Sequence, residues 1–166
     1  ALPIFLAKFN VSAVSLVTIV ACLVIMAGLM FFTGKTKMGK AMRAVSEDKA
    51  AAQLMGINVN RTISMTFAIG SALAAIAGVL LCSYSPVLQP TTGAMPGIKA
   101  FDAAVFGGIG SIPGAFVGGI LIGIIEAMAQ AYISTSLANS IVFGVLIIVL
   151  LVKPAGLLGK YVPEKV

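Results

Sequence analysis

The chain has 166 residues, of which 60% are hydrophobic and 10% charged, and its mean hydropathy is +1.11. A soluble domain is roughly 45–50% apolar and about 25% charged, so this composition argues against a soluble globular domain and against a disordered chain. The net charge of +6 does not indicate a nucleic-acid partner, because most of the chain has no charges and cannot present a basic stripe. Basic loops that face the cytoplasm explain the excess better.

The residue types that are missing narrow the chemistry. The sequence has no His, which excludes His-based metal sites, triads and proton relays. Cys22 and Cys82 lie inside apolar runs and are interpreted as buried hydrophobic residues rather than a redox pair. No Gly-x-x-x-x-Gly-Lys-Ser/Thr loop is present, so any energy from ATP must come from a partner. We therefore expect no catalytic residue, no metal and no cofactor.

Long apolar runs predict an all-α, polytopic membrane protein, because a membrane span needs about 20 mostly apolar residues. The run 98–133 has 36 residues, which is too long for one span, and the segment 110–114 is the natural place for it to break. Residues 85–97, with three prolines, are expected to be irregular. The five predicted membrane elements are 11–32, 62–84, about 99–111 (short and glycine-rich), about 114–133 and 140–152.

The distribution of Lys and Arg predicts the orientation. Segment 33–61 and the tail from Lys153 hold nine of the eleven basic residues, so both are expected to be cytoplasmic. An even number of crossings must then lie between 62–84 and the last span. Crossings by both 99–111 and 114–133 satisfy this condition. The alternative, a re-entrant loop followed by one span, would place the tail outside.

Segment 33–61 predicts a structured loop of two short helices. Its 29 residues exceed the about 12–15 beyond which loops are usually functional. A helix at about 38–45 would place Met38, Met42 and Val45 on one face.

Ser46 is expected to cap a second helix that carries Glu47 and Asp48 in its first turn. Gly56 is expected to end that helix in a left-handed conformation. The loop is either a docking element for another protein or a basic segment on anionic lipid head groups. The small residues Ala50, Ala51, Ala52 and Gly56 favour contact with a protein, because lipid insertion requires bulkier apolar groups.

Glycines recur within the predicted spans. Three Gly-x-x-x-Gly spacings overlap between positions 110 and 123, and Gly70, Ala74 and Gly78 form a matching small face on 62–84. Small residues let membrane helices approach closely. These glycines indicate either simple helix packing or thin helices that pack beside a substrate path or slide during a conformational change.

Several segments resemble one family. Gly39-Lys-Ala-Met-Arg-Ala-Val45, Glu47-Asp48, Ala51-Ala52 and Gly56-Ile57, then Lys99 to Ala115 and Lys153-Pro-Ala-Gly-Leu-Leu-Gly159, are similar to bacterial ABC importer permeases of the branched-chain amino acid family, specifically the LivH-type subunit. These permeases have close to twice this length. The chain is therefore expected to be a fragment, the C-terminal half, forming one transmembrane permease domain over 1–166.

The resemblance implies a permease in the bacterial inner membrane that moves branched-chain or related amino acids. The implied partners are cytoplasmic ATP-binding subunits, a second permease subunit, a periplasmic amino-acid-binding protein and membrane lipid, and no nucleic acid. It implies that the loop couples to the ATPase through Arg43, Glu47, Asp48, Ala51 and Gly56. The residues assigned to helix packing or the pathway are Gly70, Gly78, Gly107, Gly108, Gly110, Gly114, Gly118 and Glu126.

Two acidic residues follow the loop within the apolar part of the chain. Glu126 is expected to face the bundle or the pathway, either paired with Gln130 one helical turn on or in contact with substrate. Asp102 is expected to pair with Lys99 at the membrane interface. Glu126 also leaves open an ion-coupled secondary transporter. A membrane-embedded enzyme is disfavoured, because the chain lacks His and offers only these two carboxylates there.

Overall fold

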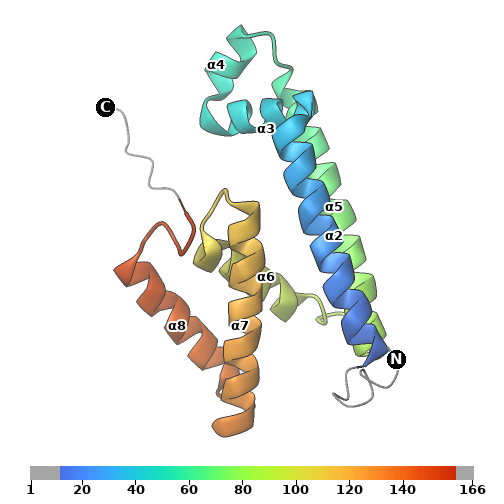
Figure 1. Ribbon diagram of the computed structural model, residues 1–166, viewed down its shortest axis with the longest axis vertical. Helices are drawn as coiled ribbons and strands as arrows, with labels where there is room; N and C mark the ends of the chain where they lie inside the picture. The colour runs from blue at the N-terminus through green and yellow to red at the C-terminus, as the bar shows by residue number, and fades with distance from the viewer. Residues whose placement is uncertain (1–11, 160–166) are drawn as a thin grey trace, which may run out of the picture. The chain divides into compact units, whose positions relative to one another are not determined.

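The structure is a computed structural model that describes residues 12–159, and within that range it is helical, with no strand (Figure 1). The predicted all-α fold is therefore confirmed. The chain divides into two compact units, Ala1–Gln89 and Pro90–Val166, which are taken in turn. The first residue of the predicted span 11–32 and the last seven residues of the tail lie outside the described residues.

The first unit is a helical hairpin with two short helices at its closed end. Its helices α2 and α5 contact each other side by side, and α3 and α4 connect them (Figure 1). Both long helices are apolar and long enough to cross a membrane, as the sequence predicts. Each extends toward the connection by about one turn more than predicted, so that the polar connection shortens to 36–58. The four helices are α2 (Ala13–Lys35), α3 (Lys37–Glu47), α4 (Lys49–Leu54) and α5 (Val59–Tyr84).

The surface of the hairpin is apolar and open. No residue of α2 is buried, and Thr62 is the single buried residue of α5. Apolar helices that leave their side chains exposed within a unit require lipid or further protein around them. The hairpin is thus a membrane-embedded element.

The second unit consists of α6 (Ala94–Gly107), α7 (Ile112–Tyr132) and α8 (Ala138–Val152). Figure 1 shows α6 crossing α7, with α8 beside α7, and contacts join all three pairs of helices. α7 is long enough to cross a membrane, and α8 is a shorter apolar helix. The core cluster consists of Ala103, Phe106, Ile122 and Val142.

The break that the sequence predicts within 98–133 is confirmed, but its boundaries differ. α6 begins at Ala94, inside the segment expected to be irregular, because Pro96 falls in the first helical turn, where its missing N–H costs nothing. The helix ends at Gly107 and not near 111, since Gly108 and Gly110 have φ values of +110° and +88°, which end a right-handed helix. With 14 residues, α6 is about 21 Å long, which is shorter than a bilayer core of about 30 Å.

Candidate functional site

Thr36 and Gly39 build the corner between α2 and α3. The Thr36 hydroxyl donates a hydrogen bond to the Phe32 carbonyl at 2.5 Å and accepts one from the Gly39 N–H at 3.0 Å. A Cβ atom on Gly39 would collide with the Phe32 carbonyl oxygen and would lie 2.7 Å from that of Thr33. The corner therefore requires glycine at position 39, a role that the family pattern alone did not reveal.

The first short helix, α3, presents the apolar face that the sequence predicts. Val45 is buried, and Met38 and Met42 are half-buried, whereas Lys40 and Arg43 are exposed. Because α3 contacts both α2 and α5, this apolar face fixes α3 to the end of the hairpin. Arg43 remains available on the outer side.

The cap of the second short helix differs from the prediction. α3 continues through Ser46 to Glu47, and the Ser46 hydroxyl donates back to the Arg43 carbonyl at 2.7 Å. Asp48 is the residue that caps α4, because its Oδ1 accepts from the N–H groups of Ala50 and Ala51 at 2.8 and 3.1 Å. The expected first-turn positions of Glu47 and Asp48 are therefore wrong, since one ends α3 and the other precedes α4.

The end of α4 matches the prediction at Gly56. Gly56 has a φ of +83°, its N–H donates to the Gln53 carbonyl at 3.0 Å, and the Ile57 N–H donates to the Ala52 carbonyl at 3.1 Å. This pair of bonds is a Schellman motif, in which a left-handed residue closes the helix. α4 is thus held at both ends, although it has only six residues.

The α3–α4 loop, residues 36–58, exposes two bulky apolar side chains that sequence reasoning missed. Leu54 is 89% exposed and Met55 is 83% exposed, and both directly precede the left-handed Gly56. The sequence offered one signal for their exposure, which is that both directly precede the residue at which the helix was predicted to end. The docking surface predicted from small residues did not include these two side chains. The five residues predicted to couple to a partner, Arg43, Glu47, Asp48, Ala51 and Gly56, are all exposed on this loop.

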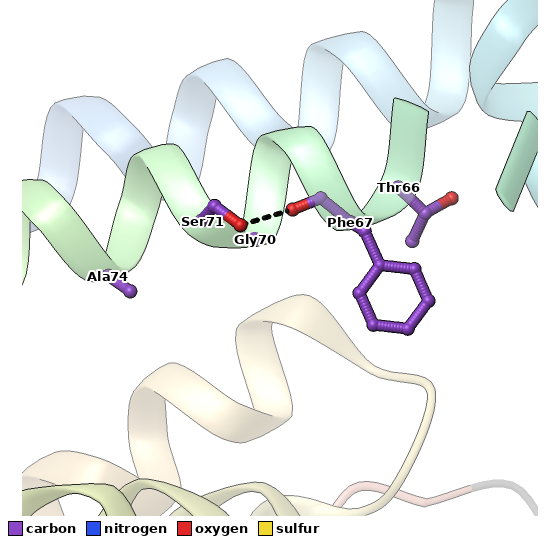
Figure 2. A pocket seen from close by; sticks show the side chains of 5 residues that line it. All are labelled: Thr66, Phe67, Gly70, Ser71 and Ala74. Atoms are coloured by element: carbon purple, nitrogen blue, oxygen red, sulfur yellow. Dashed lines mark hydrogen bonds between the residues drawn. The ribbon is translucent and has the colours of Figure 1, made fainter. Parts of the chain in front are cut away.

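The small face of α5 is present but unoccupied within the first unit. An added Cβ atom on Gly70 or Gly78 would meet no atom of that unit within 4 Å. Figure 2 shows a shallow pocket along this side of α5, where the Ser71 hydroxyl donates to the Phe67 carbonyl at 2.8 Å. The residues that line it are Thr66, Phe67, Gly70, Ser71 and Ala74.

The glycines of the second unit do pack closely. A Cβ atom on Gly114 would lie 2.6 Å from the Gly107 carbonyl oxygen, and one on Gly118 would lie 2.9 Å from the Gly107 nitrogen. α6 and α7 are therefore in backbone contact at these three positions, as small residues permit in membranes. The Gly119–Gly123 spacing does not mark a close backbone contact, because Gly119 is in ordinary contact with Ala103 and Gly123 faces open space.

The tail beyond α8 returns to the turn between α6 and α7. The N–H groups of Leu157 and Leu158 donate to the carbonyls of Phe106 and Gly107, each at 2.9 Å. Gly108, which the sequence assigned to helix packing, lies instead against this tail, and Gly110 faces open space.

Glu126 pairs with Gln130, which is one of the two alternatives that the sequence left open, and it also has a second partner. Its Oε1 accepts from the Gln130 amide at 3.1 Å and from the Lys99 ammonium group at 2.5 Å. Both charged side chains are about one-fifth to one-quarter exposed, with values of 21% for Glu126 and 25% for Lys99. Lys99 therefore joins α6 to α7, and the expected pair of Lys99 with Asp102 is wrong.

Asp102 is instead buried, with 3% of its surface exposed. Among the described residues its Oδ2 atom has no hydrogen-bond partner. The difference arises because α6 directs Lys99 across to α7, whereas Asp102 is enclosed within the second unit.

Apolar helices that leave their surfaces exposed, joined by a capped polar loop, define a multi-pass helical membrane protein. The chain matches, over residues 2–151, the family described as the branched-chain amino acid transport system permease component, and it belongs to this family. No solved structure matches it.

Curated relatives agree with this assignment. The permease LivH of Escherichia coli K12, from a high-affinity branched-chain amino acid transport system, is 52% identical over 141 residues, which cover 85% of this chain and 46% of LivH. BraD of Pseudomonas aeruginosa, of the same description, is 45% identical over 156 residues, covering 94% of this chain and 51% of BraD. The xylose permease XylH of E. coli K12 is 36% identical over 100 residues, covering 57% of this chain and 25% of XylH. The chain thus spans about half the length of LivH and BraD.

Proposed function

We propose that this chain is part of a transmembrane permease subunit of an ABC importer in the bacterial inner membrane. The subunit moves branched-chain or related amino acids, driven by ATP that cytoplasmic ATPase subunits hydrolyse. A second permease subunit completes the pathway, and a periplasmic binding protein delivers the amino acid. Family membership and the transport function of the relatives LivH and BraD support this proposal.

The observation that carries the coupling role is the α3–α4 loop. Asp48 and Gly56 fix α4 at both ends, and the loop exposes Leu54 and Met55 beside charged residues. An exposed apolar pair on a rigid support is suited to fill a pocket of a partner protein, since such anchors dominate interfaces. The loop would thus transmit movement of the ATPase to α2 and α5.

The proposed orientation places this loop and the C-terminus in the cytoplasm. Segment 33–61, which contains the loop, carries six basic residues against two acidic ones, and the basic residues are Lys35, Lys37, Lys40, Arg43, Lys49 and Arg61. Such an excess on one side of a membrane protein marks the cytoplasmic side. Two crossings between α5 and the last span α8, by α6 and α7, would be consistent with this orientation.

The test uses the full-length permease with its ATPase subunits in proteoliposomes. The double variant Leu54→Ser with Met55→Ser removes the apolar pair. Ser46→Ala, in the same loop, is the control, because the Ser46 hydroxyl bonds within α3. Burial of each side chain contributes about 1.5–3 kcal/mol, so we expect the double variant to lower affinity for the ATPase by more than about tenfold. Uptake of leucine should fall in parallel, and the control should retain both.

Two further variants test whether the charges of Asp48 and Glu47 contribute to ATPase binding, and neither disturbs the fold. Asp48→Asn keeps an N-cap acceptor while it removes the charge, and Glu47→Gln removes the neighbouring charge.

Unchanged ATPase retention and unchanged uptake in the apolar double variant would show that the loop does not dock. Uptake driven by an ion gradient without ATP would instead support a secondary transporter that uses Glu126.

A further inference from the structure

The segment 153–159 is built into the second unit at the point where α6 meets α7. Two backbone hydrogen bonds run from this segment to α6, from Leu157 to Phe106 and from Leu158 to Gly107. These bonds satisfy the carbonyl groups of the last turn of α6, which have no partner within the helix. We name this arrangement the tail clasp.

Glycine is required on both sides of the tail clasp. A Cβ atom on Gly156 would lie 2.6 Å from the Cα of Gly108 and 2.7 Å from the Val105 carbonyl oxygen. A Cβ atom on Gly108 would in turn collide with the backbone of Gly159. Both Gly108 and Gly156 also have positive φ values, +110° and +78°. Two backbone segments separated by about 50 residues in sequence are therefore in direct contact.

The tail also has an internal brace. The Lys153 ammonium group donates to the Leu157 carbonyl at 2.7 Å, and the Gly156 N–H donates to the Lys153 carbonyl at 2.9 Å. These bonds close the turn that follows α8, so that the end of α8 and the clasp are joined by a short folded segment. The end of α8 cannot move far without moving the α6–α7 turn.

We propose that the tail clasp is a positioning element that keeps α6, α7 and α8 as one body throughout the transport cycle. Gly107, Gly114 and Gly118 fix α6 against α7 near the turn that joins them, and the clasp fixes the end of α8 to that turn. The inference that it acts in transport rests on the proposed function. The existence of the clasp does not, and the two are tested separately.

The first experiment measures amide hydrogen exchange in the full-length permease in lipid nanodiscs. The amides of Leu157 and Leu158 should be protected in the nucleotide-free complex and in the complex trapped with ATP. Gly156→Ala should remove this protection. Gly110→Ala is the matched control, because Gly110 also has a positive φ, +88°, but faces open space, so protection should persist.

The second experiment compares leucine uptake by the same two variants in proteoliposomes with the ATPase subunits and the binding protein. Overpacking of backbone against backbone is poorly tolerated, and we expect Gly156→Ala to lower the maximal uptake rate by roughly tenfold relative to Gly110→Ala. The amount of ATPase retained should stay the same, because docking depends on the other unit. Lys153→Met removes only the brace, and it should give a smaller loss of both protection and uptake. This variant tests the proposal if Gly156→Ala fails to fold.

Three outcomes would overturn the proposal. Fast exchange at Leu157 and Leu158 in the unmodified permease would show that the clasp does not form. Protection that disappears in one nucleotide state would show a latch that opens and not a permanent positioning element. Lost protection with uptake equal to that of Gly110→Ala would show that the clasp has no role in transport. Failure of the unmodified permease to retain the ATPase would count against the proposed function and not against the clasp.

Discussion

Lys99 and Glu126 join α6 to α7 through an ion pair, although 27 positions separate them in sequence, and their Nζ and Oε1 atoms lie 2.5 Å apart. The pair lies toward the open end of the α6–α7 hairpin, and the contacts of Gly107 with Gly114 close the other end. α6 is thus fixed to α7 by charge at one end and by close backbone contact at the other.

The ion pair should contribute measurably to the stability of the permease. Lys99→Met leaves Glu126 with Gln130 as its remaining described partner, and polar contacts between membrane helices contribute about 1 kcal/mol. We expect a lower melting temperature for the full-length permease in detergent. The exchanged pair Lys99→Glu with Glu126→Lys should recover most of the loss, and Lys40→Met, on the exposed side of α3, should leave melting unchanged. Failure of the exchanged pair to recover stability would show that these side chains do not act mainly on each other.

Gly118 and Gly123 lie on the same helix and should respond oppositely to alanine. Gly118→Ala forces a Cβ atom against the backbone of α6, which we expect to destabilise the protein by about 1–3 kcal/mol. Gly123→Ala meets no atom within 4 Å and should be neutral or stabilising by up to about 1 kcal/mol through helix propensity. Thermal unfolding in the same detergent distinguishes them. Equal effects would mean that α6 and α7 are not in contact at Gly118.

The corner at Gly39 predicts a local effect on the α3–α4 loop. Gly39→Ala should displace α3 from the end of α2, and we expect a loss of about 1–3 kcal/mol together with faster hydrogen exchange over 37–47. Gly34→Ala is the control, because Gly34 is a helical glycine with open space around it. A Gly39→Ala variant that exchanges as slowly as Gly34→Ala would contradict the corner geometry.

Asp48, and not Ser46, should determine the start of α4. Asp48→Ala removes the acceptor for the Ala50 and Ala51 amides and should destabilise α4 by about 1 kcal/mol, measured as faster exchange at those two amides. Asp48→Asn should retain most of the protection. Ser46→Ala should leave it unchanged, since the Ser46 hydroxyl bonds within α3. Faster exchange in Ser46→Ala would show that Ser46 caps α4, as the sequence predicts.

Features that depend on local pattern could be predicted from the sequence. The apolar runs identify α2, α5 and α7, and the left-handed end of α4 follows from Gly56, because each depends on neighbouring residues alone. The pairing of Glu126 with Gln130 is local too, since it joins residues one turn apart. The residue that caps α4 could not be predicted in this way, because both Ser46 and Asp48 suit the N-cap position. Burial of Val45 against the hairpin favours a longer α3 and moves the cap to Asp48.

Contacts between distant segments could not be predicted. The partner of Lys99 depends on the register of α6 against α7, which the close approach of Gly107 to Gly114 sets. The tail clasp likewise requires the position of α8 to be known. Exposure of Leu54 depends on which side of α4 faces the hairpin, and Ala52, which is buried, occupies that side.

The shortness of α4 has a practical consequence. Isolated helices of fewer than about 12–15 residues are marginal in water, and α4 has six. Its shape depends on Asp48, on Gly56 and on the neighbouring helices of the hairpin. A synthetic peptide covering 46–57 should therefore be unstructured and should compete poorly with the intact permease for any binding partner. Competition would require a chemical staple that replaces the support of α3 and α5.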